Sequence, residues 1–145
     1  MIRLHASCAA APEGDGADAL LLLGPPGAGK SDLLLRLIDR GFTLVADDQV
    51  LIENGLARPP EALAGLLEVR GLGLFHLPYR APARLRLVIE LGPEPVRLPA
   101  PQRHEALNLP LITLAPAPAS AAARAAWALN AACGRLAQQS GAFAA

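Results

Sequence analysis

The segment from Gly24 to Ser31 constrains the fold of this chain more than any other. It reads Gly-Pro-Pro-Gly-Ala-Gly-Lys-Ser and matches the phosphate-loop pattern G-x-x-x-x-G-K-[ST] in full. A short apolar run, Ala19 to Leu23, precedes it, and an amphipathic stretch, Lys30 to Arg40, follows it. This order of buried strand, glycine-rich loop and helix is the context in which the pattern binds phosphate. The chain is therefore expected to have an α/β fold, with this loop at one end of a sheet.

Each residue type in the loop has a physical role in holding a nucleoside triphosphate. Glycines let successive backbone N–H groups turn inward around phosphate oxygens, and the start of the helix adds a positive end equivalent to roughly half a charge. Lys30 is expected to reach the β- and γ-phosphates, and the Ser31 hydroxyl to bind Mg²⁺. The alternative is a tight glycine turn that binds nothing. We predict ATP and Mg²⁺ as cofactors, with the nucleotide bound by Gly24, Pro25, Pro26, Gly27, Ala28, Gly29, Lys30 and Ser31.

The composition singles out the same lysine. Lys30 is the only lysine in the chain, and the other twelve of its thirteen basic side chains are arginines. An ammonium is a compact charge on a flexible stem, whereas a guanidinium is a planar fork. Lys30 is therefore expected at a place where a fork does not fit, rather than on the surface by chance.

Length and charge limit the class of protein. The chain has 145 residues, 52% of them hydrophobic, which predicts one domain with a substantial core. A formal net charge of zero argues against a broad nucleic-acid surface and against electrostatic attachment to a membrane. No apolar run reaches the roughly 20 residues of a membrane span, and the N-terminus lacks a secretory signal pattern. Cys8 and Cys133 are too few for a disulfide framework. We expect a cytoplasmic protein with a kinase-like domain over 1–137 and a flexible tail over 138–145.

Hydrophobic periodicity and turn residues predict the order of elements. The polar turn at 12–18 favours a hairpin between the first two strands, and Asn54-Gly55 predicts a tight hairpin. Gly41 is placed to end the first helix in the left-handed conformation, and the proline-rich stretch 92–105 is expected to be a loop. Strands are expected over 2–9, 19–23, 42–46, 49–53, 56–58, 84–91 and 109–114, and helices over 30–40, 61–67 and 120–136.

Two adjacent carboxylates, Asp47 and Asp48, follow the apolar strand 42–46. Carboxylates at the C-terminal end of a parallel strand face the ligand crevice of an open α/β sheet. Side chains alternate along an extended segment, so one aspartate could act as a base while the other binds Mg²⁺. The alternative is a solvated turn without chemistry.

These residues together resemble the HPr kinase/phosphorylase family. The family pattern joins a phosphate loop, a helix and a segment that ends in an aspartate pair, and here the segment from Gly24 to Val50 reads GPPGAGKSDLLLRLIDRGFTLVADDQV. The segment 66–75, LLEVRGLGLF, is similar to the family signature L-E-I-R-G-L-G-I. His5 lies on a strand before the phosphate-loop strand, as the family's histidine does. The resemblance covers Ile2 to about Ala132, which corresponds to the catalytic domain of longer members and suggests a short form without their amino-terminal domain.

The resemblance implies a fold and an activity. The fold is α/β and P-loop nucleoside triphosphate hydrolase-like, of the PEP carboxykinase-like type, in a single domain with a mixed sheet and flanking helices. The activity is that of a serine kinase that uses ATP and Mg²⁺ to phosphorylate HPr, a small phosphocarrier protein, and thereby regulates the phosphotransferase system and carbon or nitrogen metabolism. The family leaves open a homo-oligomer and gives no reason to expect nucleic acid or a membrane as partner.

The family's functional residues carry over to matching positions. The catalytic set would be Asp47 as the base that takes the acceptor serine's proton, Lys30 on the phosphates, His5 beside the base, and Arg97 as an active-site arginine. The metal set would be Ser31, Glu68 and Asp48.

One stretch departs from the family. Longer members carry P-V-R-P-G-R before the last helix, an element associated with dephosphorylation of the seryl product. The stretch from Ala115 to Ser120 reads Ala-Pro-Ala-Pro-Ala-Ser and contains neither arginine. The kinase half of the activity is therefore expected, and the phosphorylase half is doubtful.

Two other functions fit the residues. A kinase of a small metabolite would need an arginine-bearing lid, for which 79–86 (YRAPARLR) is the candidate stretch. A non-catalytic regulator would bind ATP and dock HPr without transferring phosphate. The complete set of Lys30, Ser31 and Asp47 argues against lost chemistry.

Overall fold

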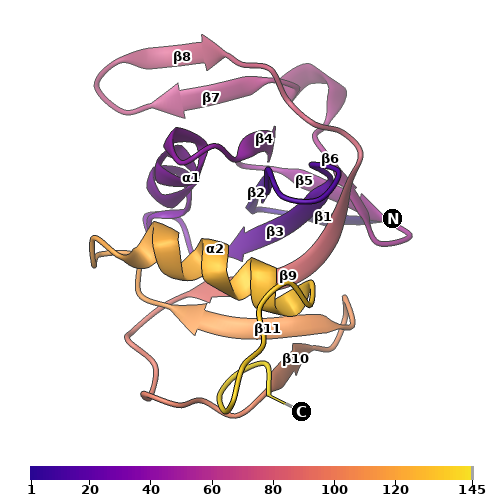
Figure 1. The fold of residues 1–145 in the computed structure, drawn as a ribbon. Helices are drawn as coiled ribbons and strands as arrows, with labels where there is room; N and C mark the ends of the chain where they lie inside the picture. Colours follow the sequence, from indigo (N-terminus) through magenta and orange to yellow (C-terminus); the bar gives the residue numbers. More distant parts are fainter. Residues whose placement is uncertain (145) are drawn as a thin grey trace.

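The computed structural model describes residues 1–144, which form a mixed α/β fold (Figure 1). The helices are α1 (Lys30–Asp39) and α2 (Ala121–Ala132), with a 3₁₀ turn at Glu61–Leu63. The strands are β1 (Ile2–Leu4), β2 (Ser7–Ala10), β3 (Asp18–Leu23), β4 (Thr43–Ala46), β5 (Val50–Glu53), β6 (Leu56–Arg58), β7 (Leu66–Val69), β8 (Gly73–His76), β9 (Ala83–Leu91), β10 (Gln102–His104) and β11 (Leu109–Leu114).

One large sheet carries the phosphate-loop strand at its centre. Its strand order is β1-β5-β6-β9-β3-β2-β4, and β9 also pairs with β11, which in turn pairs with β10. β3 runs parallel to β9 on one edge and antiparallel to β2 on the other. The expected hairpin between the first strands is confirmed by the β2–β3 pairing. The sheet is mixed, as predicted.

Alternation along β3 divides the apolar residues between two cores. Leu20 and Leu22 face one side, where they belong to the larger cluster with the buried residues of α1 and α2. Ala19 and Leu21 face the other side, where they pack with residues of β2, β4 and β5. Because both faces of β3 are buried, the strand reads as a continuous apolar run. Both helices therefore cover the same face of the sheet, and residues of β2, β4, β5, β6 and β9 form the core on the other face.

The first helix follows its sequence pattern closely. Its buried face contains Leu33, Leu34 and Leu37, spaced at helical intervals. Gly41 has φ of 104°, and its N–H donates to the Ile38 carbonyl, so the predicted left-handed end is confirmed. Asn54 and Gly55 both have positive φ, of 54° and 76°, which confirms the predicted tight hairpin between β5 and β6.

Several predicted elements are corrected. The single strand over 2–9 is two strands, because the chain bends at His5 and Ala6 and then changes its pairing partner from β5 to β3 and β4. The helix predicted over 61–67 is a 3₁₀ turn followed by β7, and the loop predicted over 92–105 contains β10. The last helix ends at Ala132, and Gly134, with φ of 79°, follows it.

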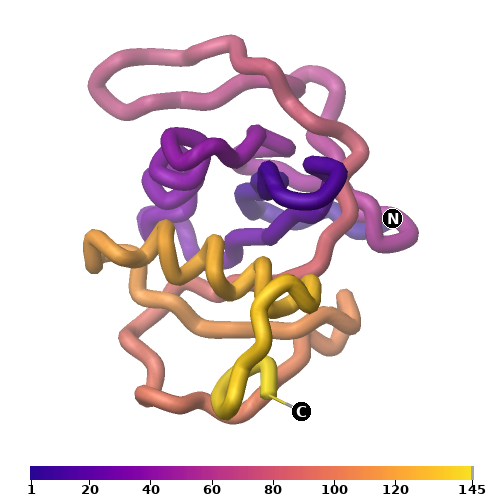
Figure 2. Tube along the Cα trace, in the orientation of Figure 1, coloured from indigo at the N-terminus to yellow at the C-terminus, as the bar shows by residue number. Residues whose placement is uncertain are grey.

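The hairpin of β7 and β8 forms a separate two-stranded sheet that extends from the body, as the upper part of Figure 1 shows. It is anchored by Leu67, which belongs to the core that contains α1. At the other end of the chain, Figure 2 shows the yellow segment that follows α2. Phe143 of this segment packs against the larger core, and residue 145, the end of the predicted tail, lies outside the described residues. In the described part of the chain, no helix has the length and apolarity that crossing a membrane requires.

Candidate nucleotide site

The phosphate loop connects the end of β3 to the start of α1. The Ala28 N–H donates to the Pro25 carbonyl at 3.0 Å, and the Gly29 carbonyl accepts the first helical N–H, from Leu33, at 3.0 Å. Gly29 has φ of 103°, and a Cβ there would lie 3.4 Å from Pro116 Cγ, so the position requires glycine. At Gly24 a Cβ would lie 3.0 Å from Ala28 Cβ. The backbone is therefore packed into a tight loop that turns into a helix N-terminus, the arrangement that binds phosphate oxygens.

Lys30 is the buried cation of this loop, with only 7% of its surface exposed. Its Nζ donates to the Gly24 carbonyl at 2.5 Å and to the Pro25 carbonyl at 3.1 Å. The ammonium thus lies inside the loop in which the phosphates are expected to bind. A guanidinium fork would be larger than this space between two carbonyls of one turn.

The loop and the aspartate pair meet through hydroxyl groups. Ser31 Oγ donates to Asp47 Oδ1 at 2.9 Å. Ser7 Oγ, from β2, donates to the same oxygen at 2.8 Å. Asp47 follows β4, which pairs with β2 in the antiparallel direction. β2 separates β4 from β3, and the carboxylate reaches the loop because β4 and β3 run in the same direction on either side of β2.

Asp48 points to a different partner. Its φ is 71°, in the left-handed region that non-glycine residues seldom adopt. The Asp48 carboxylate Oδ1 lies 3.1 Å from His5 Nδ1, and its carbonyl oxygen lies 2.7 Å from the same nitrogen. The structure therefore places His5 against Asp48 and not against Asp47, and it turns the two aspartates to different neighbours.

Two of the predicted residues lie apart from this group. Glu68 is exposed in β7, opposite Leu74 of β8. Arg97 is exposed in the segment between β9 and β10. Neither side chain forms a hydrogen bond or an ion pair with any residue of the described range 1–144. Within the same range, no three His, Cys, Asp or Glu side chains come together in a way that could hold a metal ion.

Sequence reasoning missed two contributors to the site. Arg36 donates to the Pro116 carbonyl at 2.6 Å and to the Pro118 carbonyl at 3.4 Å, and so holds the segment 115–120 beside Gly29. Arg36 reads as part of the polar face of a helix, and its partners lie about eighty residues later, so no local signal reveals the contact. Ser7 alternates with apolar Leu4 and Ala6 in the sequence and so reads as a polar, outward position of a strand over 2–9, but the bend at His5 turns it inward.

A second polar cluster lies at the start of β3. The buried Asp18 carboxylate, 6% exposed, lies within 3.3 Å of guanidinium nitrogens of Arg84, Arg86 and Arg135. Burial by itself raises the pKa of Asp18, but the hydrogen bond from Arg135 and the charges of Arg86 and Arg84 outweigh it and lower this pKa overall. Asp15 also pairs with Arg84, whose hydrogen bond lowers the Asp15 pKa. Two arginines of the candidate lid 79–86 are therefore held in ion pairs.

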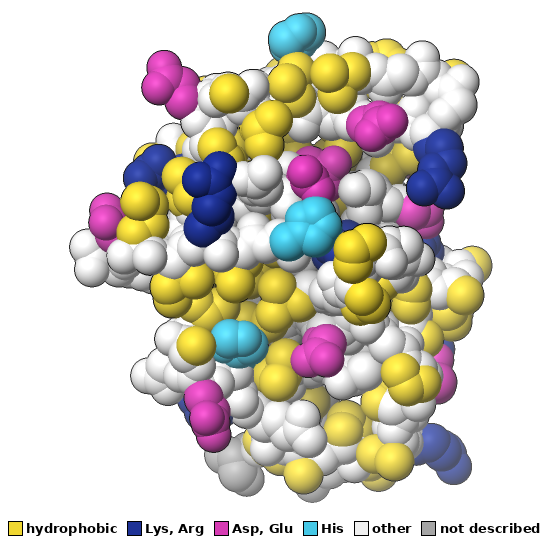
Figure 3. All heavy atoms as spheres, turned by 180° about the vertical axis from the view of Figure 1, so that it is seen from behind, with side chains coloured by type: hydrophobic (Ala, Val, Ile, Leu, Met, Phe, Trp, Pro, Cys, Tyr) yellow, Lys and Arg dark blue, Asp and Glu magenta, His cyan; other side chains and the backbone are white. Residues whose placement is uncertain are grey.

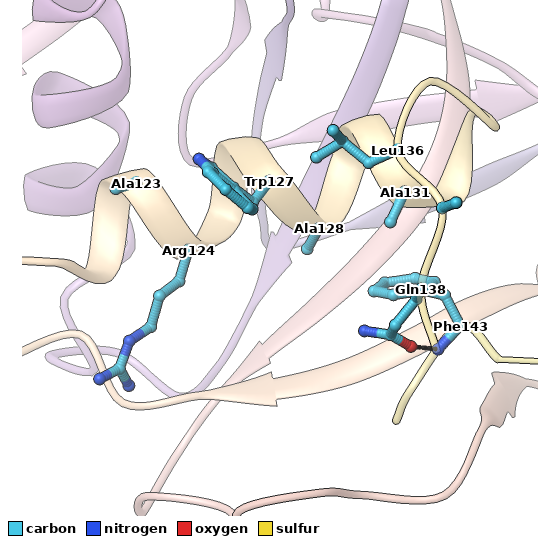
Figure 4. A pocket seen from close by; sticks show the side chains of 9 residues that line it. Ala123, Arg124, Trp127, Ala128, Ala131, Leu136, Gln138 and Phe143 are labelled. Carbon is cyan, nitrogen blue, oxygen red and sulfur yellow. Dashed lines mark hydrogen bonds between the residues drawn. The ribbon is translucent and has the colours of Figure 1, made fainter. Parts of the chain in front are cut away.

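A groove of substantial volume lies away from the phosphate loop. It has a volume of about 640 Å³ along α2, and Figure 4 shows Arg124, Trp127, Leu136 and Phe143 among the residues that line it. None of the predicted site residues lines it. Arg124 pairs instead with Glu94 at 2.8 Å.

Charged side chains are dispersed over the surface. On the face shown in Figure 3, basic and acidic side chains alternate with apolar ones and do not merge into a continuous basic area. This agrees with the formal net charge of zero. The face lacks the clustered basic residues that nucleic-acid binding requires.

Comparison with known proteins yields one family. Residues 17–80 match the family described as HPr Serine kinase C-terminal domain. The HPr kinase/phosphorylase of Bordetella pertussis (strain Tohama I) is 40% identical over 106 residues, and that of Azoarcus sp. (strain BH72) is 37% identical over 116 residues. These matches cover 65% and 66% of this chain and 33% and 37% of the relatives, so the chain spans about a third of their length.

A solved structure is similar as well. The Hpr(Ser) kinase/phosphatase from Coxiella burnetii superposes with a TM-score of 0.64 at 25% sequence identity, over 79% of this chain and 86% of that chain. The similarity covers most of the described fold and includes sheet and helices together.

Proposed function

We propose that this chain, whose residues 17–80 match the HPr Serine kinase C-terminal domain family, is an ATP-dependent protein serine kinase whose acceptor is an HPr-like phosphocarrier protein. By this proposal it acts in the cytoplasm and regulates the phosphotransferase system. The observation that carries the proposal is the hydrogen bond of 2.9 Å from Ser31, the last residue of the phosphate loop, to Asp47. It joins the nucleotide loop to a carboxylate that can accept a proton.

The residues present fit Mg²⁺ together with ATP. A hydroxyl has one hydrogen and two lone pairs, so Ser31 can donate to Asp47 and still offer its oxygen to the metal. Mg²⁺ in nucleotide sites is bound by one or two protein oxygens together with phosphates, rather than by an all-protein cage. Asp48, the residue after Asp47, is proposed as a carboxylate ligand to Mg²⁺. Glu68 is proposed as a further ligand. When bound, Mg²⁺ neutralises charge that develops on the phosphates.

The proposed transfer is a direct displacement. Asp47 takes the proton from the acceptor serine hydroxyl, whose oxygen forms the new bond to the γ-phosphorus while the bond from that phosphorus to the β–γ bridging oxygen breaks. Lys30 exchanges its loop carbonyls for β- and γ-phosphate oxygens and stabilises the negative charge on the ADP that leaves. His5 orients the Asp48 side of the site, and Arg97 is proposed as a further active-site cation. Such chemistry needs positioning and charge neutralisation more than covalent catalysis.

A direct transfer assay tests this function. The chain is incubated with ATP labelled at the γ-phosphate and a panel of HPr-like proteins, each in a wild-type and a serine-substituted form. Label on the wild-type acceptor alone supports the proposal. ATP hydrolysis or binding without labelling of any acceptor supports a non-catalytic regulator, and labelling of small metabolites supports a metabolite kinase. Size measurement of the active species would show whether it is a homo-oligomer.

A further inference from the structure

Ser7 is a buried hydroxyl beside the proposed base. Among residues 1–144, the buried residues with polar or charged side chains are Ser7, Asp18 and Lys30. Asp18 is paired with arginines, and Lys30 lies in the phosphate loop. Ser7 is 1% exposed, and its hydroxyl is directed at Asp47 Oδ1. Because burial of an unpaired hydroxyl is costly, its burial is explained by the carboxylate that it binds.

The sheet places Ser7 between the loop and the carboxylate. Ser7 begins β2 and lies opposite Leu22 of β3, two positions before Gly24. On its other edge β2 pairs with β4, and Cys8 lies opposite Ala46, the residue before Asp47. The register of β2 and β4 shifts between Cys8 and Ala9. Ser7 therefore belongs to rigid structure that touches both halves of the site.

We propose that Ser7 is a positioning residue for Asp47, an inference that rests on the proposed function. Asp47 Oδ1 accepts the hydroxyl hydrogens of both Ser7 and Ser31. The carboxylate is thereby fixed from the buried side by Ser7 and from the helix side by the exposed Ser31. Its second oxygen is left to the acceptor hydroxyl. The hydrogen of Ser31 is donated to Asp47, so the lone pairs of Ser31 would remain available to bind Mg²⁺.

Without Ser7, the Asp47 carboxylate would keep, among residues 1–144, only the hydrogen bond that Ser31 donates to it. Its side chain would then be free to rotate away from both the acceptor and Ser31. Ser7→Ala is therefore expected to weaken two things together, namely the contribution of Mg²⁺ to ATP binding and the rate of transfer. A hydrogen bond to an ionised group corresponds to about a tenfold to hundredfold effect. ATP binding in the absence of metal depends on the loop and is expected to stay unchanged.

The first experiment does not require catalysis. The affinity for ATP is measured by calorimetry with Mg²⁺ and with a chelator, for wild type, Ser7→Ala and Ser7→Thr. In Ser7→Ala, the increase in ATP affinity that Mg²⁺ causes is expected to be about tenfold smaller than in wild type. Ser7→Thr keeps the hydroxyl and is expected to show the wild-type increase. Cys8→Ala is the packing control, since it removes one buried heavy atom from the next position of β2. An equal loss in Cys8→Ala, or a Ser7→Ala protein with the full Mg²⁺-dependent gain, overturns the inference.

The second experiment separates Ser7 from the proposed function. With wild-type protein that transfers phosphate to an HPr-like acceptor, kcat and KM are measured for Ser7→Ala, Asp47→Asn and the double variant. A residue that acts through Asp47 lowers kcat in the wild-type background and has no further effect in the Asp47→Asn background. Additive losses, or a change in the KM for ATP alone, contradict the positioning role while leaving the kinase intact. Absence of transfer in wild type contradicts the proposed function. In that case the calorimetric measurements still test whether Ser7 positions Asp47.

Discussion

At the scale of single residues, the Lys30 side chain already forms hydrogen bonds within the phosphate loop. The Lys30 ammonium donates to two carbonyls of its own turn, so the proposed nucleotide would have to replace these contacts. The exchange is favourable because phosphate oxygens carry negative charge, and charge-assisted hydrogen bonds are roughly twice as strong as neutral ones. Selectivity of the loop for highly charged phosphates follows from this competition.

Lys30→Ala is predicted to weaken ATP binding by at least about 100-fold, since two charge-assisted contacts to phosphate are lost. The fold should persist, because the helix that begins at this residue is held by Leu33, Leu34 and Leu37. Calorimetric titration with ATP measures the affinity, and circular dichroism checks the fold. Arg40→Ala, which removes an exposed cation at the end of the same helix, is the matched control and should bind ATP normally. Unchanged affinity in folded Lys30→Ala protein would contradict the loop assignment.

Asp47→Asn is predicted to keep ATP binding and to lower the rate of phosphate transfer by about 10²–10⁴, the usual range for loss of a general base. Asp48→Asn is the comparison, because its carboxylate faces His5 instead. Its defect should be partly rescued by excess Mg²⁺, whereas that of Asp47→Asn should not. The measurement is single-turnover transfer from labelled ATP over a range of Mg²⁺ concentrations. Transfer at the wild-type rate by Asp47→Asn would exclude it as the base.

At the scale of elements, Asp18 links three separate parts of the chain. It lies at the start of β3, binds Arg84 and Arg86 of β9, and binds Arg135 beyond the end of α2. Asp18→Asn would leave these guanidinium groups without their shared charge and is predicted to lower the free energy of unfolding by about 2–4 kcal/mol. Because the three arginines are partly exposed, the predicted loss of unfolding free energy is smaller than it would be at a fully buried site. Chemical denaturation at neutral pH measures the loss.

The pH dependence of this loss has a definite sign. The pKa of Asp18 is lowered in the folded state, so its contribution is fully present above the unfolded pKa of about 3.9. It decreases as the pH falls below that value toward the folded pKa. The difference in unfolding free energy between wild type and Asp18→Asn should therefore be constant above about pH 5 and shrink below about pH 4. A difference that grows on acidification would contradict the pairing.

The elements differ in how well they could be predicted from the sequence. The phosphate loop, α1, the β5–β6 hairpin and β9 follow from local patterns, because glycine conformations and apolar spacing decide them. The insertion of β2 between β3 and β4 could not be predicted, since a run of small residues such as Ser7–Ala10 does not specify its neighbours. The β7–β8 hairpin was missed because a glycine-rich turn at 71–73 reads as a loop. Within the site, Ser31 and Asp47 could be named from local motifs, whereas the Ser7 and Arg36 contacts depend on partners distant in sequence.

At the scale of the whole molecule, we expect the segment 115–120 to decide which direction of the proposed reaction is supported. Arg36 holds it beside Gly29 of the phosphate loop, yet the segment itself contributes no cation. Attack of inorganic phosphate on a phosphoserine brings two highly charged groups together, and fixed guanidinium groups are suited to neutralise them. Arg124, one turn into α2, is paired with Glu94 and so is already engaged.

We predict that the protein is chiefly a kinase, with little or no phosphorylase activity. The assay supplies seryl-phosphorylated HPr and millimolar inorganic phosphate and measures release of pyrophosphate. The expected rate is far below that of forward transfer under matched conditions. Ala117→Arg is the informative variant because it introduces a guanidinium group into the segment 115–120. If the reverse reaction is slow for lack of positive charge there, this variant should raise its rate. Reverse transfer as fast as forward transfer in the wild-type protein would refute the prediction.

The parallel pairing of β3 with β9 has a consequence for synthesis of the chain. Asp18 and Arg84, at the start of this pairing, are 66 residues apart, and the whole phosphate loop lies before β9. A ribosome that has released residues 1–80 has therefore already made every nucleotide-binding residue of the loop, while β3 still exposes one unpaired apolar edge. Such edges recruit other chains, and pairing between distant segments is slow. We therefore expect the nascent chain to complete the pairing of β3, and with it the support of the proposed phosphate loop, only after β9 emerges.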